Sequence, residues 1–372
     1  LVSFMRHKNY KCEHFDNINT ICYIHSSCDE VFDVIPLKNT WTRNTWMNSV
    51  FSWHRLDSSL VIDFEASTFK TTLGKNGVVD GGKHDPRMIP VYNAKKDIKF
   101  PLAGRRREIF PERTVNKRTL LIFRKDDHNP FFMYSLAFNI WVAKIDVEQI
   151  IFMDEAPKQE SEKLFSLVIA PIMKLPTGKV QFTNAWLSPS EYTGALMDHL
   201  NDAQPCKESF YVTRFAQKVV GNIKRLQQRV IFVSRQNYNG RRLGRVLKNE
   251  NEIIEATRTL FPTIQKVVFE NMTFDEQVRI SAEATYMFGM HGAGLANALW
   301  MQKGAHLIEI FPKHKRRWGY RNIAQYKGFS YTQFRGGIDG ENDSKRIDVN
   351  DWKSFLHNIR TKTTPPPSSV TP

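Results

Sequence analysis

Cysteine is scarce in this sequence, and the few cysteines present are not arranged as metal ligands. Only four occur among 372 residues, and none belongs to a C-x-x-C pair. Zinc sites built from cysteine and histidine use such closely spaced pairs, so the sequence gives no sign of one. Cys12, Cys22 and Cys28 crowd the N-terminal region, and we expect at least one disulfide among them in an oxidising compartment.

Long apolar runs are also missing. No stretch of 18 or more apolar residues occurs, so the sequence contains no candidate membrane-spanning helix. Because the chain begins with Leu1 rather than methionine, we expect the full-length protein to carry a preceding signal anchor, its only link to a membrane. The sequons at Asn271 and Asn342 favour a secretory protein of type II topology in the Golgi or endoplasmic reticulum lumen.

Positive charge is abundant and spread along the chain. Lysine and arginine number 53 against 38 acidic residues, which gives a formal net charge of +15 and favours anionic partners. The densest runs, 105–107 and 313–317, are short, so a solvated basic face is an equally good interpretation of each. Since no RNP-type motif or basic helical stripe accompanies the charge, we expect no nucleic-acid partner.

The composition supports a large folded core, because 41% of the residues are hydrophobic and 12% aromatic. Residues 1–115 show no clear periodicity. The run 119–123 predicts a buried strand, 131–144 a helix and 149–153 a second strand, which together form a βαβ unit. A long helix over 207–228 is expected to join two halves of the chain.

The C-terminal part alternates regularly between strand and helix patterns. Such alternation predicts a parallel sheet with helices on both faces, whose ligands bind beyond the carboxyl ends of the strands. Thr273 and Glu276 form a capping-box pattern at the start of one helix. The predicted strands are 230–233, 266–269, 286–290, 306–311 and 331–334, and the predicted helices are 249–260, 274–284, 294–301, 321–327 and 348–360.

Three segments at the predicted carboxyl edge carry candidate binding residues. The glycine-rich segment 291–297, HGAGLAN, follows a strand and opens a helix, where free backbone N–H groups attract a phosphate. Glu309 lies inside an apolar strand, where a carboxylate is costly unless it holds a ligand such as ribose or pairs with a nearby arginine. Arg235 follows another strand and could neutralise a diphosphate, with Arg241 and Arg242 in the next loop, where surface solvation is the alternative.

These segments, in this order and spacing, resemble glycosyltransferase family 61, a resemblance that covers roughly the last 250 residues. It implies a GT-B-like α/β fold of two Rossmann-like halves facing a cleft, and inverting, metal-independent transfer of a pentose or N-acetylglucosamine-type sugar. The donor would be a uridine diphosphate (UDP) sugar and the acceptor a glycan or glycoprotein, with no further cofactor. The absence of an Asp-x-Asp triplet agrees with the absence of a metal. The expected donor-binding residues are Arg235, Arg241, His291, Gly292, Ala293, Gly294, Leu295, Asn297 and Glu309.

The expected boundaries follow from these patterns. Residues 1–115 form an N-terminal extension and part of the acceptor half, 116–206 the Rossmann-like acceptor half, 207–362 the nucleotide-sugar half and 363–372 a disordered tail.

The acceptor half departs from the family pattern Asn-x-x-His-x-x-x-Asp, because Phe132 and Leu136 stand where the family has histidine and aspartate. The nearby residues Asp127, His128 and Asp126, in that order, are the candidates for the catalytic base. Capping of the helix that begins near Pro130 is the alternative role for the two aspartates. The alternative functions are an inactive relative that binds nucleotide sugars or glycans, an NAD-dependent oxidoreductase and a nucleic-acid-binding protein.

Overall fold

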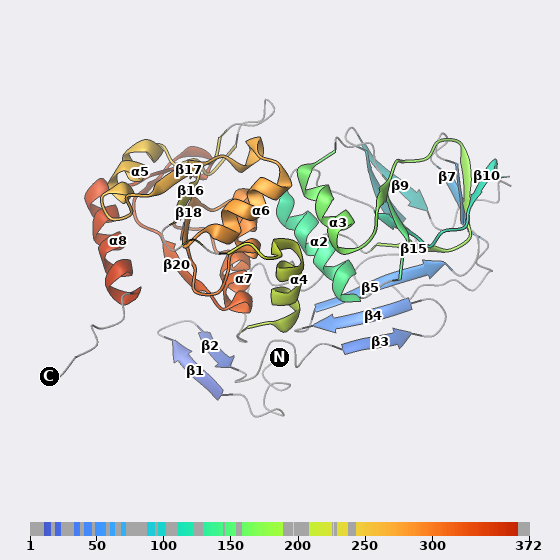
Figure 1. Cartoon of the computed structure of the whole chain (residues 1–372), viewed down its shortest axis with the longest axis horizontal. Helices are drawn as coiled ribbons and strands as arrows, with labels where there is room; N and C mark the ends of the chain where they lie inside the picture. Colours follow the sequence, from blue (N-terminus) through green and yellow to red (C-terminus); the bar gives the residue numbers. More distant parts are fainter. Residues whose placement is uncertain are drawn as a thin grey trace. The chain divides into compact units, whose positions relative to one another are not determined.

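The chain divides into two compact units, residues 1–200 with 209–219 and residues 201–208 with 220–372. Figure 1 shows the elements of both units. The computed structural model describes residues 11–15, 19–23, 33–37, 41–46, 49–56, 60–63, 68–71, 88–93, 96–101, 111–122, 129–143, 146–153, 158–188, 196, 208–224, 226, 229–236 and 243–363.

The first unit is built on a seven-stranded mixed sheet. Its strand order is β13-β12-β11-β15-β5-β4-β3. The first four strands are parallel, whereas β5 pairs antiparallel with β15 and continues into the antiparallel β4 and β3. The predicted βαβ unit is therefore present, but a meander from the unpatterned N-terminal region extends its sheet. The bounds are β3 Asp33–Leu37, β4 Trp41–Trp46, β5 Ser49–Leu56, β11 Thr119–Ile122, β12 Gln149–Phe152, β13 Ile172–Met173 and β15 Ala185–Leu187.

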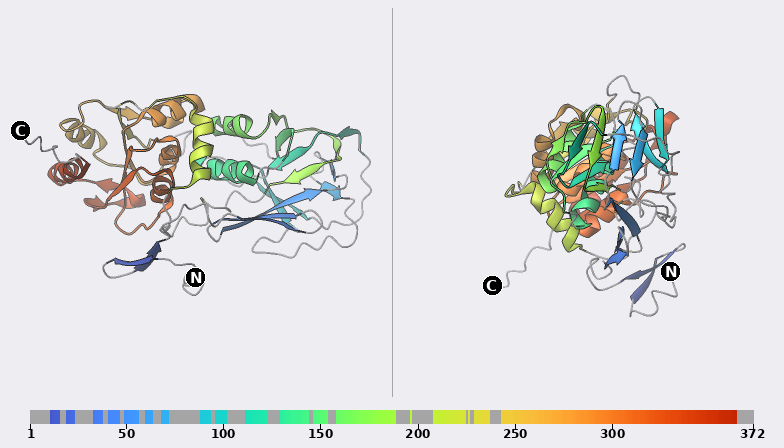
Figure 2. Two further views of the ribbon diagram at one scale, coloured as in Figure 1. Left: turned by 60° about the horizontal axis from the view of Figure 1, so that its bottom comes forward. Right: turned by 90° about the vertical axis from the view of Figure 1, so that its right-hand side faces the viewer.

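Helix α2 (Pro130–Ala143) follows β11 and is almost entirely buried. Asn129 caps it, since its side-chain oxygen accepts a hydrogen bond from the Phe131 N–H at 3.1 Å. Leu136, which stands at the family's aspartate position, is fully buried in the core. Phe138 of α2 meets Phe215 of α4 (Phe210–Val220) edge to face, and Figure 2 shows the yellow-green α4 beside the green helices. The remaining helices here are η2 Glu160–Glu162 and α3 Lys163–Val168.

Helix α4 is shorter than the predicted helix over 207–228. It ends at Val220, where Gly221 takes a left-handed backbone conformation with φ of 61°. All of α4 except Val220 belongs to the first unit. The expected boundaries of the acceptor and nucleotide-sugar halves stay predictions. The other strands of the first unit are β1 Lys11–Phe15, β2 Asn19–Tyr23, β6 Leu60–Asp63, β7 Thr68–Thr71, β8 Met88–Asn93, β9 Lys96–Pro101, β10 Arg113–Val115 and β14 Lys179–Phe182.

These strands form a four-stranded sheet in the order β10-β14-β6-β7 and the hairpins β1-β2 and β8-β9. The β1-β2 register sets Cys12 opposite Cys22. The disulfide expected among the N-terminal cysteines stays a prediction.

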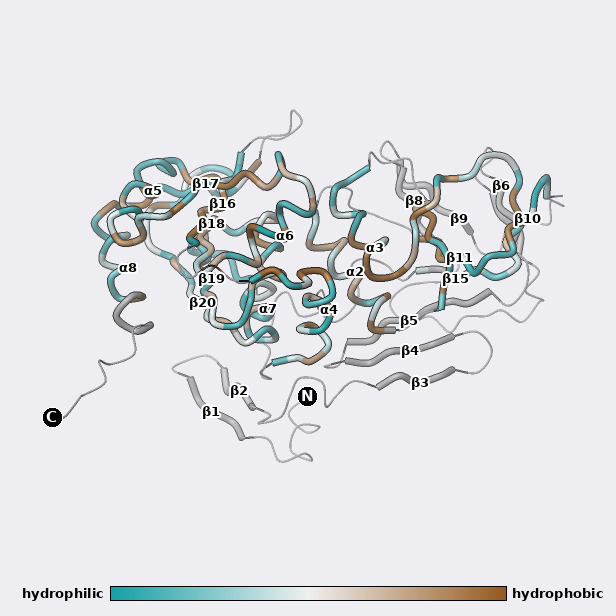
Figure 3. The backbone as a smooth tube through the Cα atoms, viewed as in Figure 1, coloured by the Kyte–Doolittle hydropathy of each residue, from teal (hydrophilic) through white to brown (hydrophobic). Residues whose placement is uncertain are grey.

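The second unit contains a five-stranded parallel sheet in the order β17-β16-β18-β19-β20. The strands predicted from the sequence over 230–334 are all present within two residues of their expected bounds. Their apolar character is visible as brown segments at β16 and β18 in Figure 3. The bounds are β16 Val230–Val233, β17 Ile264–Val267, β18 Tyr286–Met290, β19 His306–Ile310 and β20 Ser330–Phe334.

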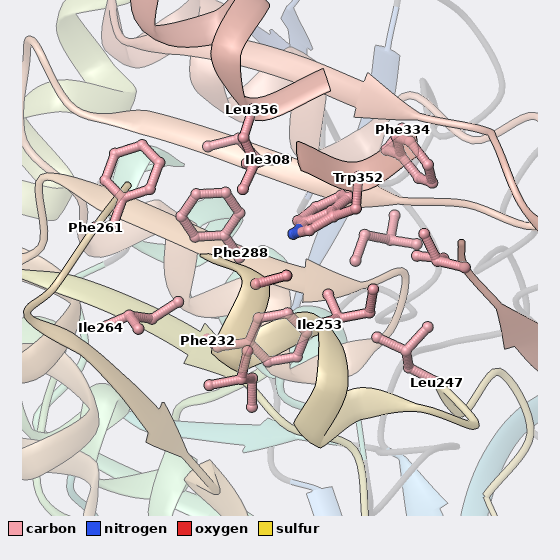
Figure 4. Packing of buried hydrophobic residues seen from close by; sticks show 14 of the residues in the cluster. Phe232, Leu247, Ile253, Phe261, Ile264, Phe288, Ile308, Phe334, Trp352 and Leu356 are labelled. Carbon is pink, nitrogen blue, oxygen red and sulfur yellow. The ribbon is translucent and has the colours of Figure 1, made fainter. Parts of the chain in front are cut away.

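Helices cover both faces of this sheet, which makes the unit doubly wound. Helices α5 (Glu250–Arg258) and α8 (Val349–Thr363) cover one face and close a core in which Phe232, Phe288 and Trp352 pack together (Figure 4). The other face carries α6 (Phe274–Glu283), η4 (Ala293–Trp300) and α7 (Gly319–Lys327). The short elements are η3 Phe269–Asn271, β21 Ile338–Asp339, η5 Glu341–Asp343 and β22 Lys345–Arg346.

The capping box expected at the start of α6 is present. Thr273 donates its backbone N–H to Glu276 at 2.9 Å, and its hydroxyl accepts from the Glu276 N–H at 3.4 Å. In the part of the chain that the structure describes, every helix is too short or too polar to cross a bilayer.

Candidate functional site

The candidate site lies where the connections of the parallel sheet diverge. From β16 the chain crosses to β17 on one side and returns to β18 on the other, so β16 and β18 are neighbours whose following loops separate. A crevice at such a switch point is the usual ligand position in doubly wound sheets. Arg235 follows β16, and His291 and Gly292 follow β18, so the sequence-predicted residues meet at this point.

The Arg235 side chain lies directly against the backbone of Gly292. A β-carbon at position 292 would collide with the guanidinium group, so only glycine leaves room for this contact. Nη2 of Arg235 donates to the Gly244 carbonyl at 3.3 Å, while Nε is buried and has no hydrogen-bond partner among the described residues. Burial, and then the charge of Arg245, lower the pKa of this guanidinium from its usual value.

Arg245 supplies a second positive charge that the sequence patterns did not indicate. Its backbone is left-handed, with φ of 59°, and its N–H donates to the Asn342 carbonyl at 2.7 Å. Among the residues that the structure describes, neither Arg235 nor Arg245 forms an ion pair with a carboxylate, although Glu270 acts on Arg235 at longer range. Two neighbouring cations without a paired anion make a site suited to a phosphate or diphosphate.

Glu309 is held by two protein side chains. Its Oε1 lies 2.5 Å from His291 Nδ1, and its Oε2 accepts a hydrogen bond from the Tyr331 hydroxyl at 2.6 Å. The residue is only 1% exposed. The partner is a histidine rather than the arginine of the alternative interpretation. The direct ribose contact expected for Glu309 stays a prediction. The carboxylate thus fixes the orientation of the His291 ring.

Two aromatic side chains complete the environment of His291. The Phe311 ring stacks on it with centroids 4.6 Å apart, and Tyr320 of α7 lies beside it at 5.7 Å. The Tyr320 hydroxyl donates to the Gly292 carbonyl at 2.7 Å. Burial and the charge of Glu309 raise the pKa of Tyr320, so the phenol stays protonated and remains a donor that fixes the glycine turn.

The rest of the glycine-rich segment divides into two parts. Ala293 and Gly294 are partly exposed at the start of η4. Leu295 and Asn297, also expected to bind the donor, are fully buried. The Asn297 amide donates to Gln277 Oε1 at 3.1 Å and to the Gly294 carbonyl at 3.3 Å, so both residues shape the turn from inside.

A hydrogen-bonded series continues outward from Glu309. Gln333 Nε2 donates to the Tyr331 hydroxyl at 2.7 Å, and Arg335 Nε donates to Gln333 Oε1 at 3.0 Å. Sequence reasoning missed these residues along with Tyr320. The sequence did contain a signal for Tyr331 and Gln333. They are polar residues two positions apart, and therefore on one face, in the strand that pairs with the strand of Glu309. No local sequence pattern pointed to Tyr320, because helix α7 brings it to the glycine-rich turn from a later part of the chain.

Several predicted residues lie outside the described ranges. These are the candidate bases Asp126, Asp127 and His128 and the loop residues Arg241 and Arg242. Within the described ranges, no group of three or more histidine, cysteine, aspartate or glutamate side chains could hold a metal ion.

Comparison with known proteins connects this geometry to a family. Residues 34–308 match the family model described as Glycosyltransferase 61, which is well over half of the chain. The match begins far upstream of the roughly 250 C-terminal residues in which we expected the resemblance. It includes the meander strands β4 and β5 and all of β3 except Asp33. It ends at Ile308, one residue before Glu309.

Curated proteins with related sequences are glycosyltransferases by name. The chain is 23% identical over 267 residues to beta-1,2-xylosyltransferase RCN11 of Oryza sativa subsp. japonica, covering 60% of this chain and 50% of that protein. It is 32% identical over 94 residues to the EGF domain-specific O-linked N-acetylglucosamine transferase of Gallus gallus, covering 24% of this chain and 17% of that protein. It is 38% identical over 74 residues to protein O-linked-mannose beta-1,4-N-acetylglucosaminyltransferase 2 of Xenopus laevis, covering 19% of this chain and 13% of that protein. The chain thus spans half or less of the length of these relatives.

Proposed function

Because the chain belongs to the Glycosyltransferase 61 family, we propose that it transfers a sugar from a UDP-sugar to a hydroxyl group of a glycan or glycoprotein. The observation that carries this proposal is the pair of arginines, Arg235 and Arg245, at the switch point of the parallel sheet. A nucleotide diphosphate supplies the negative charge that these cations lack. Neutralising it also stabilises the UDP leaving group as the bond between the anomeric carbon of the sugar and the diphosphate oxygen breaks.

We propose that the reaction is inverting and needs no metal ion. Two guanidinium groups can do at the leaving diphosphate what a divalent cation does in metal-dependent enzymes. His291 adds a third polar contact, since its Nδ1 is engaged by Glu309 and its Nε2 is left for the ligand. In this arrangement Glu309 acts on the donor through His291.

Inversion requires a base that takes the proton of the acceptor hydroxyl as its oxygen attacks the anomeric carbon. We propose Asp127 for this role, followed by His128 and Asp126, from their place after the first predicted strand of the acceptor half. The helix cap that was the alternative role for the aspartates is supplied by Asn129. Alanine at the true base should lower kcat by about a hundredfold or more and leave donor affinity unchanged.

The sugar and the compartment follow as narrower proposals. The names of the relatives point to xylose or N-acetylglucosamine as the transferred sugar. The asparagines of both sequons, Asn271 and Asn342, are exposed, which suits glycosylation of this chain in the secretory pathway. Protein made in a secretory host should lose mass when treated with an N-glycosidase, and an unchanged mass would contradict this placement.

Calorimetric titration tests the donor site. UDP should bind the wild-type chain in the presence of a chelator, and Arg235→Met should weaken binding by about a hundredfold, because a charged hydrogen-bond pair is worth roughly 1.5–3 kcal/mol. Arg279→Met is the matched control, since Arg279 is an exposed residue of α6 that pairs only loosely with Glu283 at 3.7 Å. Turnover of a UDP-xylose and UDP-N-acetylglucosamine panel then separates an enzyme from a binding protein. Wild-type protein that binds no UDP would overturn the proposal.

A further inference from the structure

Arg335 occupies an unusual position just beyond the carboxyl end of β20. It is half-buried, yet in the described part of the chain it forms no ion pair with a carboxylate. Its guanidinium instead donates to three neutral acceptors and lies 4.8 Å from the centre of the Phe311 ring. The acceptors are Gln333 Oε1 at 3.0 Å and the carbonyls of Lys315 at 2.7 Å and Lys313 at 3.2 Å.

A relay of hydrogen bonds connects Arg335 to His291. Arg335 orients the Gln333 amide by donating to its oxygen, and the amide nitrogen then donates to the Tyr331 hydroxyl. The Tyr331 hydroxyl accepts from Gln333 and donates its own proton to Glu309 Oε2. The other carboxylate oxygen, Oε1, is then available to His291 Nδ1. Each group in the series has one orientation that satisfies both neighbours, so the direction set at Arg335 reaches the imidazole.

A second route passes through Phe311. The same phenylalanine ring meets the Arg335 cation and stacks on His291 with an interplanar angle of 19°. Arg335 also holds the carbonyls of the segment that follows Phe311, so it anchors this ring through the backbone as well. If Arg335 is displaced, both the Glu309 carboxylate and the Phe311 ring lose the contacts that hold them against the His291 imidazole.

We infer that Arg335 is a positioning residue for His291. It sets the ring plane and keeps the Nδ1–H of His291 directed at the Glu309 carboxylate, so that Nε2 is the atom offered to the donor. This role deepens the proposed function. Only the expected effect of Arg335 on UDP binding rests on that function. The same contacts fix the start of the basic segment 313–317 through the carbonyls of Lys313 and Lys315.

The direct test is NMR of the full chain labelled with 15N-histidine, with His291→Gln identifying the His291 signals. Wild-type protein should show a strongly hydrogen-bonded Nδ1–H at His291. Arg335→Met keeps a side chain of similar length but loses the donors and the charge, and should shift or abolish that signal. Tyr331→Phe keeps the ring but removes the hydroxyl from the relay, and should change the signal less, because the Phe311 route survives.

Arg346→Met serves as the matched control. Arg346 lies on β22 nearby in the sequence, is 64% exposed and makes a single weak ion pair with Glu252 at 3.6 Å. This variant should leave the His291 signal unchanged. Arg335→Lys should restore it only in part, since an ammonium group cannot reproduce the planar set of donors.

UDP affinity supplies the second readout. Arg335→Met should weaken UDP binding by about tenfold, equivalent to about 1.4 kcal/mol, with the melting temperature used to confirm a folded protein. An unchanged Nδ1–H signal in folded Arg335→Met or, should that variant not fold, in Tyr331→Phe would overturn the inference. If wild-type protein binds no UDP, the proposed function fails, while the NMR comparison still decides whether Arg335 positions His291.

Discussion

The guanidinium of Arg235 fills the space that a side chain at position 292 would need, so Arg235 and Gly292 are sterically complementary. The glycine has an extended backbone, with φ of 173°, that any residue could adopt. Glycine is therefore needed at position 292 for the space it leaves and not for backbone freedom. It allows the Arg235 cation, which follows the neighbouring strand β16, to lie against the backbone of the HGAG turn.

Gly292→Ala should displace the arginine rather than unfold the turn. The atoms in the way belong to the end of a flexible side chain, so we expect a melting temperature close to that of wild type and UDP affinity reduced by about tenfold or more. A double-mutant cycle with Arg235→Ala checks the cause. Once the arginine is gone, adding Gly292→Ala should cost nothing further, and additive losses would contradict the steric explanation.

Arg245→Asn should separate charge from backbone strain. Asparagine tolerates the left-handed conformation that Arg245 adopts, so thermal stability should be preserved or slightly increased. Loss of one of the two cations proposed to bind the diphosphate should reduce UDP affinity by roughly tenfold. Calorimetric titration beside a thermal melt measures both effects. Unchanged affinity in a folded variant would remove Arg245 from the diphosphate site.

His306 should make the protein sensitive to acid. Burial lowers its pKa from 6.5 to about 4, and its Nε2 lies 2.8 Å from the Thr332 hydroxyl. Between these two pH values the unfolded chain binds the proton and the folded chain does not, so stability falls as the pH falls from 6.5 to 4. At about 1.4 kcal/mol per pKa unit, the loss amounts to roughly 3 kcal/mol.

The His306→Gln variant should lack this part of the pH dependence in urea unfolding measured from pH 7 to pH 4. His357→Gln, at an exposed position of α8, is the matched control and should behave like wild type. Parallel stability curves for wild type and His306→Gln would show that His306 is not responsible.

Lys327 should destabilise the folded state at neutral pH. It is 8% exposed at the end of α7, and burial lowers its pKa from 10.5 to about 7. The unfolded chain retains the proton up to pH 10.5, so stability should rise between pH 7 and 10.5. Lys327→Met should raise the free energy of unfolding at pH 7 by about 1–3 kcal/mol and remove that rise.

Calorimetric melts at pH 7 and pH 9 test this prediction. Lys353→Met at an exposed position of α8 is the control and should change little. A lower melting temperature for Lys327→Met than for wild type at pH 7 would mean that the lysine has a stabilising role.

Local patterns predicted the elements of the second unit well. The alternation of short apolar runs with amphipathic segments located β16, β18 and α6, and the capping box at Thr273 located the start of α6. Helix α4 was overestimated, because the pattern did not reveal that Gly221 ends it. The meander β3 to β5 was missed, since its strands gain stability from pairing with β15, more than a hundred residues away along the chain.

The sequence by itself determined which residues come to the carboxyl edge of the parallel sheet. Arg235, His291 and Glu309 each end or follow an apolar strand, and parallel strands present their ends at one edge. The partners of these residues were decided only by the tertiary structure. Glu309 meets Tyr331 from β20, and Arg235 lies against Gly292 from β18, because strand order and register bring together residues that are 22 or more positions apart. Whether a buried carboxylate faces a ligand or a histidine depends on such packing, which no local pattern encodes.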